Sequence, residues 1–417
     1  MTAAEIMQQG LKIAVIVGAL FSCATAQAPP DAALRQLYDG HRLFELRNAM
    51  DGRDAPALYR GAVASAFNNV DEAEKSLNQA VRDASTKEDA NEAREWLIEL
   101  YMRLGRSSNA VRVLDEALKA APSRSDLQNA KRLLDPIARY PNQTVRAGRR
   151  QAVSCIVGAA GVVLPVSVNG KAVNWLLDTG FNMSALSESE ARMLGLPVHA
   201  GTAQTEDFAG GTAPARTAVA PRVTIGGTEL RNVPMLVFPD SQPPWNEFPA
   251  GRRGTVGLPM ALALQIVEWT TSGTCHVGVT SSSGDTNSGR NLAFDRSTPL
   301  TRVRFEGRSL DFVLDTGNQG GTQLWARFAR EFSALVSEQG RQGALRVSQI
   351  GGSSERDVIV LPEARLHVGG LDAVLRPANI FSPPIGNDMY HGNLGMDVLS
   401  QAAAVTIDFQ SMSLTLR

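Results

Sequence analysis

The pattern of apolar and polar residues divides the chain into two regions. Residues 30–142 are rich in Ala, Leu, Glu and Arg and contain few Gly, which favours α-helices. From about residue 150 to the end, short runs rich in Val and Ile, such as VVLPVSV (162–168) and VNWLLD (173–178), are separated by Gly, Asn and Pro. Such runs predict β-strands joined by turns. We therefore expect a multidomain protein, with an all-α N-terminal module followed by an all-β region.

The helical region contains a weak internal repeat. Ala73 and Ala110, and likewise Ala80 and Ala117, occupy matching places in two consecutive stretches. Small residues at these places let two antiparallel helices approach closely, and Pro122 marks the end of the second stretch. We expect helical hairpins, with room for two repeats and a capping helix.

The second of these stretches resembles a tetratricopeptide repeat, and the first matches that family less well. The residues that carry the resemblance are Trp96, Leu97, Leu100, Tyr101, Gly105, Ala110, Ala117 and Pro122. The resemblance implies a module that binds a protein partner on its helical repeats. An ordinary helical bundle is the alternative interpretation of the same residues.

The β region also repeats within itself. Four landmarks recur in one order about 140 residues apart, namely Asp178 and Asp315, Gly210 and Gly351, Gly226 and Gly369, and Gly257 and Gly395. A polar segment, SSSGDTNSGRN (281–291), separates the two copies. Four landmarks in one order are hard to obtain by chance. We therefore expect two homologous lobes, residues 150–280 and residues 290–417.

Each lobe contains an Asp-Thr-Gly triplet at the end of an apolar run, so each Asp should lie near a buried surface, where an unpaired charge is costly. If the lobes pack about a pseudo-twofold axis, Asp178 and Asp315 meet there and share one proton, because two close carboxylates do not ionise together easily. The ionised carboxyl can take a proton from a water molecule, while the protonated one polarises the carbonyl that this water attacks. The titration belongs to the pair, so the sequence does not identify the base.

The residues that follow each Asp are candidate supports for the pair. Gly180 and Gly317 let the backbone approach the carboxylates closely. The hydroxyls of Thr179 and Thr316 can form hydrogen bonds across the axis and hold the two loops rigid. The candidate catalytic groups are thus two carboxyls, each supported by its own Thr-Gly pair.

From about residue 150 to the end, the chain resembles an aspartic protease of the pepsin/retropepsin kind. The motifs that carry the resemblance are LLDTG, VLDTG and the closing GNLGMDVL…VTIDF…LTL. Retropepsins have one copy of the motif and dimerise, so two copies imply a single-chain, bilobal acid-protease fold. The resemblance implies a peptide or protein substrate and hydrolysis without a metal, a cofactor or a covalent intermediate.

The resemblance also implies a β-hairpin flap that closes over the substrate. In lobe 1, EDFAGGTAPAR (206–216) fits this position, with Phe208 in the place of an aromatic flap residue and with Gly210 and Gly211 beside it. The matching SQIGGSSERD (348–357) of lobe 2 is interpreted as either a second flap or a plain hairpin.

The residues that follow the two triplets depart from the family's pattern. After Asp-Thr-Gly the family often has Ala, Ser or Thr, whereas this chain has Phe181 and Asn318. These neighbours help to set the proton affinity of the pair, so we make no prediction of the pH optimum. The Pro- and Gly-rich segment 370–393 is interpreted as a surface loop rather than as part of the cleft.

The first residues have the layout of a secretory signal peptide. A lysine precedes an apolar run (13–21) and small residues, and the Ala-Thr-Ala of residues 24–26 offers a cleavage site. Residues 1–26 are therefore expected to be removed on export, to the periplasm or as a secreted protein. Cys23 lies in a segment that resembles a bacterial lipobox, so contact with a membrane is expected only if Cys23 is lipidated. A buried N-terminal helix is the alternative.

Cysteine content and composition narrow the function further. Cys155 and Cys275 either form one disulfide in an oxidising compartment or remain two buried thiols. A formal net charge of −1 does not indicate a nucleic-acid-binding protein, and the spacing of the 5 His does not indicate a zinc site. We expect an exported aspartic endopeptidase. The alternative is a catalytically silent protease-like scaffold whose helical repeats bind a protein partner.

Overall fold

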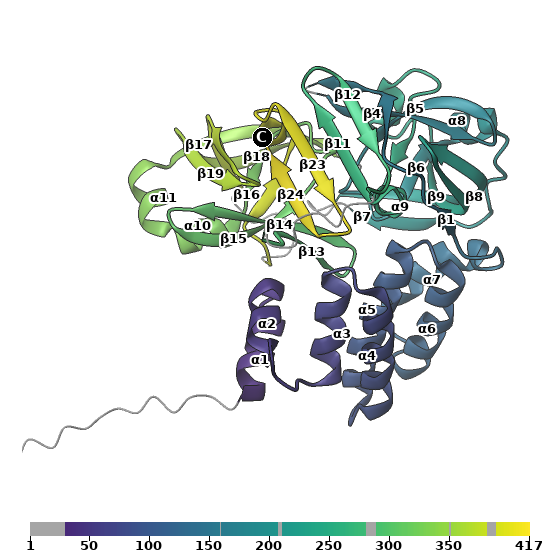
Figure 1. Cartoon of the computed structure of the whole chain (residues 1–417), viewed down its shortest axis with the longest axis horizontal. Helices are drawn as coiled ribbons and strands as arrows, with labels where there is room; N and C mark the ends of the chain where they lie inside the picture. Colours follow the sequence, from purple (N-terminus) through teal and green to yellow (C-terminus); the bar gives the residue numbers. More distant parts are fainter. Residues whose placement is uncertain (1–29, 159, 207–210, 281–288, 350–351, 382–388) are drawn as a thin grey trace, which may run out of the picture.

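A computed structural model describes residues 30–158, 160–206, 211–280, 289–349, 352–381 and 389–417. The expected signal peptide of residues 1–26, with Cys23, lies outside the described residues, as do Phe208 and Gly210 of the expected flap. The expected fold class is confirmed, because an N-terminal helical region is followed by a β-rich region of two lobes. Figure 1 shows the helices of the N-terminal region below the two lobes.

Helices that are consecutive in the sequence pack side by side in the N-terminal module. They are α1 (Pro30–Asp39), α2 (Leu43–Met50), α3 (Ala57–Ala66), α4 (Val70–Asp83), α5 (Lys87–Arg103), α6 (Ser107–Ala120) and α7 (Ser125–Ala138). The packed pairs include α3 with α4, α5 with α6, and α6 with α7. Ala73, Ala110 and Ala117 are fully buried, which suits small residues where helices approach closely. The likeness to tetratricopeptide repeats stays a prediction.

Helix α5 illustrates how the sequence defines these elements. The Oγ1 of Thr86 accepts the backbone N–H of Asp89 at 3.1 Å and so caps the first turn. Trp96 and Leu97 are buried against the rest of the module. Gly105 then adopts a φ of 66°, a left-handed conformation that ends the helix and that glycine adopts readily.

Lobe 1 is built mainly on one sheet with the strand order β1-β9-β8-β4-β5-β10. Its strands are β1 (Thr144–Arg146), β2 (Gln151–Ser154), β3 (Ile156–Gly158), β4 (Gly161–Val168), β5 (Lys171–Leu177), β6 (Ser184–Ser187), β7 (Ala203–Glu206), β8 (Thr212–Ile225), β9 (Thr228–Phe238), β10 (Thr255–Val256), β11 (Ile266–Thr270) and β12 (Thr274–Val277). Its helices are α8 (Glu188–Leu194), the short 3₁₀ helix η1 (Trp245–Glu247) and α9 (Leu258–Leu264).

Lobe 2 is built mainly on a second sheet with the order β17-β18-β21-β16-β22-β15-β14-β19-β20. Its strands are β13 (Leu292–Asp295), β14 (Thr298–Phe305), β15 (Arg308–Leu314), β16 (Gln323–Leu324), β17 (Arg341–Gln349), β18 (Gly352–Leu361), β19 (Ala364–Val368), β20 (Leu371–Leu375), β21 (Ala378–Phe381), β22 (Gly392–Leu394), β23 (Ala404–Asp408) and β24 (Ser413–Leu416). Its helices are α10 (Ala326–Glu331), α11 (Ser333–Gln339) and α12 (Met396–Leu399).

The internal repeat of the sequence is also a repeat of strand pairing. In lobe 1, β10 runs parallel to β5 and places Val256 opposite Leu177. In lobe 2, β22 runs parallel to β15 and places Leu394 opposite Leu314. A short helix follows each of these strands, α9 in lobe 1 and α12 in lobe 2. The residues that follow β5 and β15 therefore occupy equivalent places.

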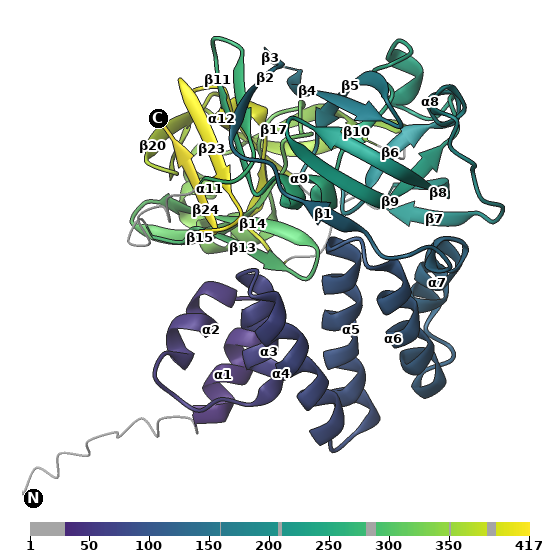
Figure 2. The same cartoon turned by 45° about the vertical axis from the view of Figure 1, so that its right-hand side comes forward.

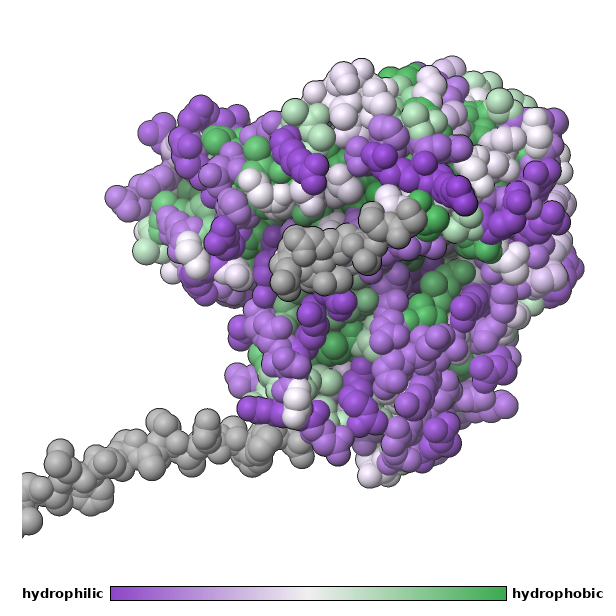
Figure 3. Space-filling view, in the orientation of Figure 1, coloured by the Kyte–Doolittle hydropathy of each residue, from purple (hydrophilic) through white to green (hydrophobic). Residues whose placement is uncertain are grey.

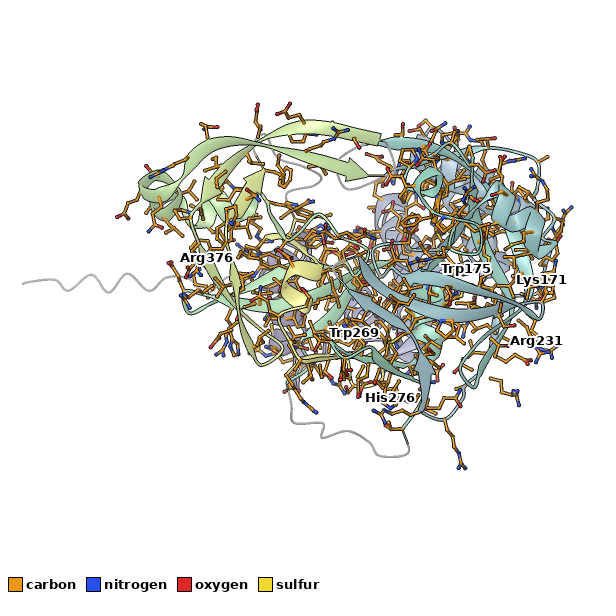
Figure 4. The ribbon with its side chains drawn as sticks, turned by 90° about the horizontal axis from the view of Figure 1, so that it is seen from above. Lys171, Trp175, Arg231, Trp269, His276 and Arg376 are labelled. Atoms are coloured by element: carbon orange, nitrogen blue, oxygen red, sulfur yellow. A yellow bond between two sulfur atoms is a disulfide. The ribbon has the colours of Figure 1, made fainter. Side chains whose placement is uncertain are left out.

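A third sheet, with the order β2-β12-β11-β23-β24, joins the lobes through the antiparallel pairing of β11 with β23. Figure 4 shows the labelled Trp269 of this sheet between Lys171 of lobe 1 and Arg376 of lobe 2. Cys155 and Cys275 form a disulfide with their Cα atoms 5.9 Å apart, which decides between the bridge and two thiols.

The helical module packs on both lobes. Helices α2 and α3 contact β13 of lobe 2, α5 contacts α9 of lobe 1, and α7 contacts β7 and β8. The fully buried Arg103 donates through Nη1 to the backbone oxygen of Arg296 at 2.6 Å, and its guanidinium lies 4.2 Å from the ring centre of Phe294. Figure 2 shows α5 rising to the underside of the β region. On the face in Figure 3, hydrophilic residues cover most of the module.

The interpretation of segment 370–393 as a surface loop is wrong for most of its described part. Strands β20 and β21 form there, and β21 pairs with both β18 and β16 inside the sheet of lobe 2. Ala373 and Ile380 are buried. The Pro and Gly residues punctuate short strands here instead of replacing them. No helix in the described ranges is long and apolar enough to cross a membrane.

Candidate active site

Each Asp-Thr-Gly triplet begins directly after a strand, and a neighbouring strand of the same lobe holds its first residue. The backbone N–H of Asp178, after β5, donates to the oxygen of Val256 at 3.0 Å. The backbone N–H of Asp315, after β15, donates to the oxygen of Leu394 at 3.1 Å. The two loops therefore leave their sheets in the same way, each continuing the parallel strand pair described above.

Two threonines join the loops across the lobe boundary. The backbone N–H of Thr179 donates to Oγ1 of Thr316 at 3.0 Å, and the N–H of Thr316 donates to Oγ1 of Thr179 at 3.1 Å. Each hydroxyl also donates to a backbone oxygen of the other lobe, that of Thr179 to Leu314 at 2.7 Å and that of Thr316 to Leu177 at 2.9 Å. Both threonines are buried. These four bonds fix the position of one loop relative to the other.

Close approach between the loops requires glycine after each threonine. A Cβ atom on Gly180 would lie 2.6 Å from Oδ1 of Asp315, and one on Gly317 would lie 2.4 Å from Oδ1 of Asp178. Each carboxylate therefore lies against the glycine of the opposite loop, where a side chain would clash with it. The structure thus brings Asp178 and Asp315 together, with their supporting residues, at the boundary of the lobes.

The environment of both carboxyls favours bound protons. Burial raises the pKa of Asp178 well above its usual range, and the nearby charge of Asp315 raises it further. Burial also raises the pKa of Asp315, although a hydrogen bond from the Asn393 side chain opposes this rise. The backbone N–H of Gly180 donates to Oδ1 of Asp178 at 3.1 Å, and that of Gly317 donates to Oδ1 of Asp315 at 3.0 Å. The pair can therefore retain a proton at pH values where an exposed aspartate is ionised.

Sequence reasoning missed Asn393. Its Nδ2 donates to Oδ2 of Asp315 at 3.0 Å from β22, in the segment that we interpreted as a surface loop. The signal was present in the internal repeat, which aligns GTVG at Gly254 with GNLG at Gly392 and so places Asn393 opposite Thr255. A residue that differs between two otherwise similar motifs indicates a position where the two lobes make different contacts.

The two residues that depart from the family pattern have structural contacts. The backbone oxygen of Phe181 accepts the N–H of Leu258 at 2.9 Å, and the Phe181 ring packs edge-on against Phe238 with ring centres 6.3 Å apart. The oxygen of Asn318 accepts the N–H of Met396 at 3.0 Å in the equivalent arrangement. Both residues thus tie an Asp-Thr-Gly loop to the helix that follows the supporting strand.

Hairpins occur at both places where the sequence suggested flaps. In lobe 1, β7 pairs with β8, and Gly211 directly precedes β8. In lobe 2, β17 pairs with β18 as a long antiparallel hairpin. Helix α7 contacts the first hairpin, where the Asn129 side chain donates to the backbone oxygen of Gln204 at 2.6 Å and accepts its N–H at 3.0 Å. The helical module therefore holds the outer strand of the lobe 1 hairpin.

Within the described ranges, no group of three or more His, Cys, Asp and Glu side chains is arranged to hold a metal ion.

Lobe 1 resembles a known protein family. Residues 164–256 match the model of a family described as aspartyl protease. The matched segment includes Asp178 and the supporting strand β10. A crystal structure of a retropepsin-like aspartic protease from Rickettsia conorii is similar at 15% identity, covering 33% of this chain and 96% of that chain, with a TM-score of 0.23. No functionally curated protein matches the chain.

Proposed function

We propose that this protein is an aspartic endopeptidase that hydrolyses peptide bonds with a water molecule activated by Asp178 and Asp315. The observation that carries the proposal is the meeting of two carboxyls, one from each lobe, on loops joined by reciprocal threonine hydrogen bonds. The aspartyl protease match over residues 164–256 supports it.

One shared proton is sufficient for both steps of hydrolysis. The ionised carboxyl takes a proton from water as the water oxygen bonds to the peptide carbon, and the protonated carboxyl gives its proton to the carbonyl oxygen. The neutral gem-diol that results then collapses. The proton taken from water passes to the amide nitrogen, the C–N bond breaks, and a hydroxyl proton returns to the other carboxyl. The pair ends with one proton, as it began.

The substrate class that suits this chemistry is a peptide or a protein segment. The β7–β8 hairpin is our candidate for a flap over such a substrate, held on its outer side by Asn129 of α7. The disulfide between Cys155 and Cys275 supports an exported protein, because structural disulfides persist in oxidising compartments.

The helical module has a proposed supporting role in the same enzyme. It contacts both lobes, and α5 touches α9, the helix that follows the strand supporting Asp178. Such contacts would fix the position of one lobe relative to the other. Binding of a protein partner on the helical repeats stays a prediction.

The proposal is tested by incubating the full-length mature protein with casein and identifying new peptide termini by mass spectrometry. We expect internal cleavage that persists in the presence of a chelator and after thiol alkylation. The doubly substituted Asp178→Asn, Asp315→Asn protein, which keeps the shape of both side chains, is the matched control and should release no fragments. A folded wild-type protein that leaves casein intact would contradict the proposal and favour the silent scaffold.

A further inference from the structure

The two carboxyls of the pair have different neighbours, although the loops that hold them are alike. The Asn393 side chain donates through Nδ2 to Oδ2 of Asp315 at 3.0 Å. Asn393 is only 5% exposed, and its backbone on β22 pairs with Val313 of β15, shortly before Asp315. The contact is therefore part of the strand pairing that supports the loop, and it is shielded from water.

Lobe 1 has a different residue at the equivalent position. Thr255 occupies on β10 the place that Asn393 occupies on β22, and its Oγ1 accepts the backbone N–H of Ala185 at 3.1 Å. From the described residues, the Asp178 carboxylate accepts hydrogen bonds from backbone N–H groups, including that of Gly180 at 3.1 Å, and from no side chain. The side-chain donor is thus specific to the carboxyl of lobe 2.

We propose that Asn393 is a positioning residue that keeps Asp315 ionised and the shared proton on Asp178, an inference that rests on the proposed aspartic protease function. An N–H group that donates to a carboxylate stabilises the ionised form over the protonated form. In a buried site, water competes little with this bond. Asp315 is then the base that takes the proton from water, and Asp178 is the acid that protonates the carbonyl oxygen.

The electrostatics of the site agree with this assignment. Burial raises the pKa of both carboxyls, and the charge of Asp315 raises the pKa of Asp178 further. The bond from Asn393 lowers the pKa of Asp315 and has no counterpart at Asp178 among the side chains that the structure describes. The direction of the effect depends on the orientation of the amide, because an amide oxygen facing Asp315 would instead favour the protonated form. Because Nδ2 of Asn393 donates to Oδ2 of Asp315, it forms a charge-assisted hydrogen bond with the ionised carboxylate.

The test is to titrate each carboxyl alone in the full-length protein, using the ¹³C NMR signal of its side-chain carboxyl carbon. In Asp178→Asn, only Asp315 of the pair titrates, and adding Asn393→Leu should raise the pKa of Asp315. In Asp315→Asn, the same addition should leave the pKa of Asp178 unchanged, because the amide contacts the other carboxyl. Thr255→Val in Asp178→Asn is the matched control and should not move the pKa of Asp315.

Two outcomes would overturn the inference. An unchanged pKa of Asp315 would show that Asn393 does not stabilise its charge, and a lowered pKa would show that the amide faces the carboxyl through its oxygen. If Asn393→Leu does not fold, Asn393→Val replaces it, since lobe 1 accommodates the similar shape of Thr255 at this place. In active protein, Asn393→Leu should also shift the acidic limb of the kcat/KM profile to higher pH.

The NMR titration requires no turnover, so it separates this inference from the proposed function. A protein that cleaves casein but shows no effect of Asn393→Leu on the pKa of Asp315 contradicts the inference alone. A protein with the expected titration that cleaves nothing contradicts the function and leaves the role of Asn393 in the pair intact.

Discussion

Thr179 and Thr316 exchange hydrogen bonds between backbone N–H and side-chain oxygen, at 3.0 Å in one direction and 3.1 Å in the other. Each hydroxyl also donates to a backbone oxygen of the opposite lobe. The loops that present the two carboxyls are therefore joined directly to each other as well as to their own sheets. The relative position of the carboxyls depends on this junction.

The first prediction concerns the threonine junction. Thr316→Val keeps the side-chain shape but removes the acceptor of the Thr179 N–H and the donor to the Leu177 oxygen, both in a buried site. We expect the free energy of unfolding to fall by about 2–4 kcal/mol, because buried polar groups lose their partners. Thr316→Ser keeps the hydroxyl and should cost only about 1 kcal/mol. Denaturant unfolding measures both, and equal losses would contradict a role for the hydroxyl.

The second prediction concerns pH and stability. The pKa of Asp178 and that of Asp315 are raised in the folded protein, so the folded state binds protons more tightly than the unfolded state. This contribution to stability is present below the ordinary aspartate pKa of about 3.9 and is lost as the pH rises through the raised values. Asp178→Asn removes one titrating group and the charge repulsion. The variant should therefore gain stability relative to wild type as the pH rises from about 4 to about 7.

Thermal unfolding of both proteins across that pH range measures the difference. Asp311→Asn is not a suitable control, because Asp311 is paired with Arg302. Asp54→Asn is suitable, since Asp54 is fully exposed and its surface ion pair with Arg60 contributes little to stability, so this variant should show no such trend. A stability difference between wild type and Asp178→Asn that is independent of pH would contradict the raised pKa values.

The third prediction concerns the contact between the helical module and lobe 2. Arg103 is fully buried and donates to the backbone oxygens of Arg296 at 2.6 Å and of Ser65 at 2.8 Å. Arg103→Ala should lower the free energy of unfolding by about 3–5 kcal/mol, because it leaves a cavity and buried oxygens without partners. Arg35→Ala is the matched control, since Arg35 pairs with Asp39 at the surface, and it should cost less than about 1 kcal/mol.

Hydrogen exchange locates the effect of Arg103→Ala. Faster exchange should appear in β13 and in the turn at Arg296 before it appears in the lobe 1 sheet. Uniform acceleration over the whole chain would show that Arg103 stabilises the fold in general and is not specific to the contact between the module and lobe 2.

The meeting of Asp178 and Asp315 was predictable from the sequence because the chain contains an internal repeat. Two copies of one motif imply two equivalent places, and the apolar runs before Asp178 and Asp315 place both at strand ends. The same local logic predicted the strands that include 162–168 and 173–177, because short apolar runs between turn residues indicate β-structure without reference to distant parts of the chain.

Features that depend on pairing between distant segments were not predictable in this way. The contact of Asn393 with Asp315 arises from the register of β22 on β15, which the sequence does not state. The docking of the module depends on single side chains such as Arg103, which follow no repeated pattern. Segment 370–393 misled for a related reason, since its short strands are stabilised by neighbours in the sheet and not by local composition.

Whether Asp178 and Asp315 act as one catalytic unit is tested by the rate of casein hydrolysis from about pH 3 to about pH 8 for wild type, Asp178→Asn and Asp315→Asn. We expect a bell-shaped profile for wild type, because only the singly protonated pair is active. Each folded single variant should lose activity by about a thousandfold or more. A folded single variant that keeps the wild-type rate would show that the two carboxyls do not act together.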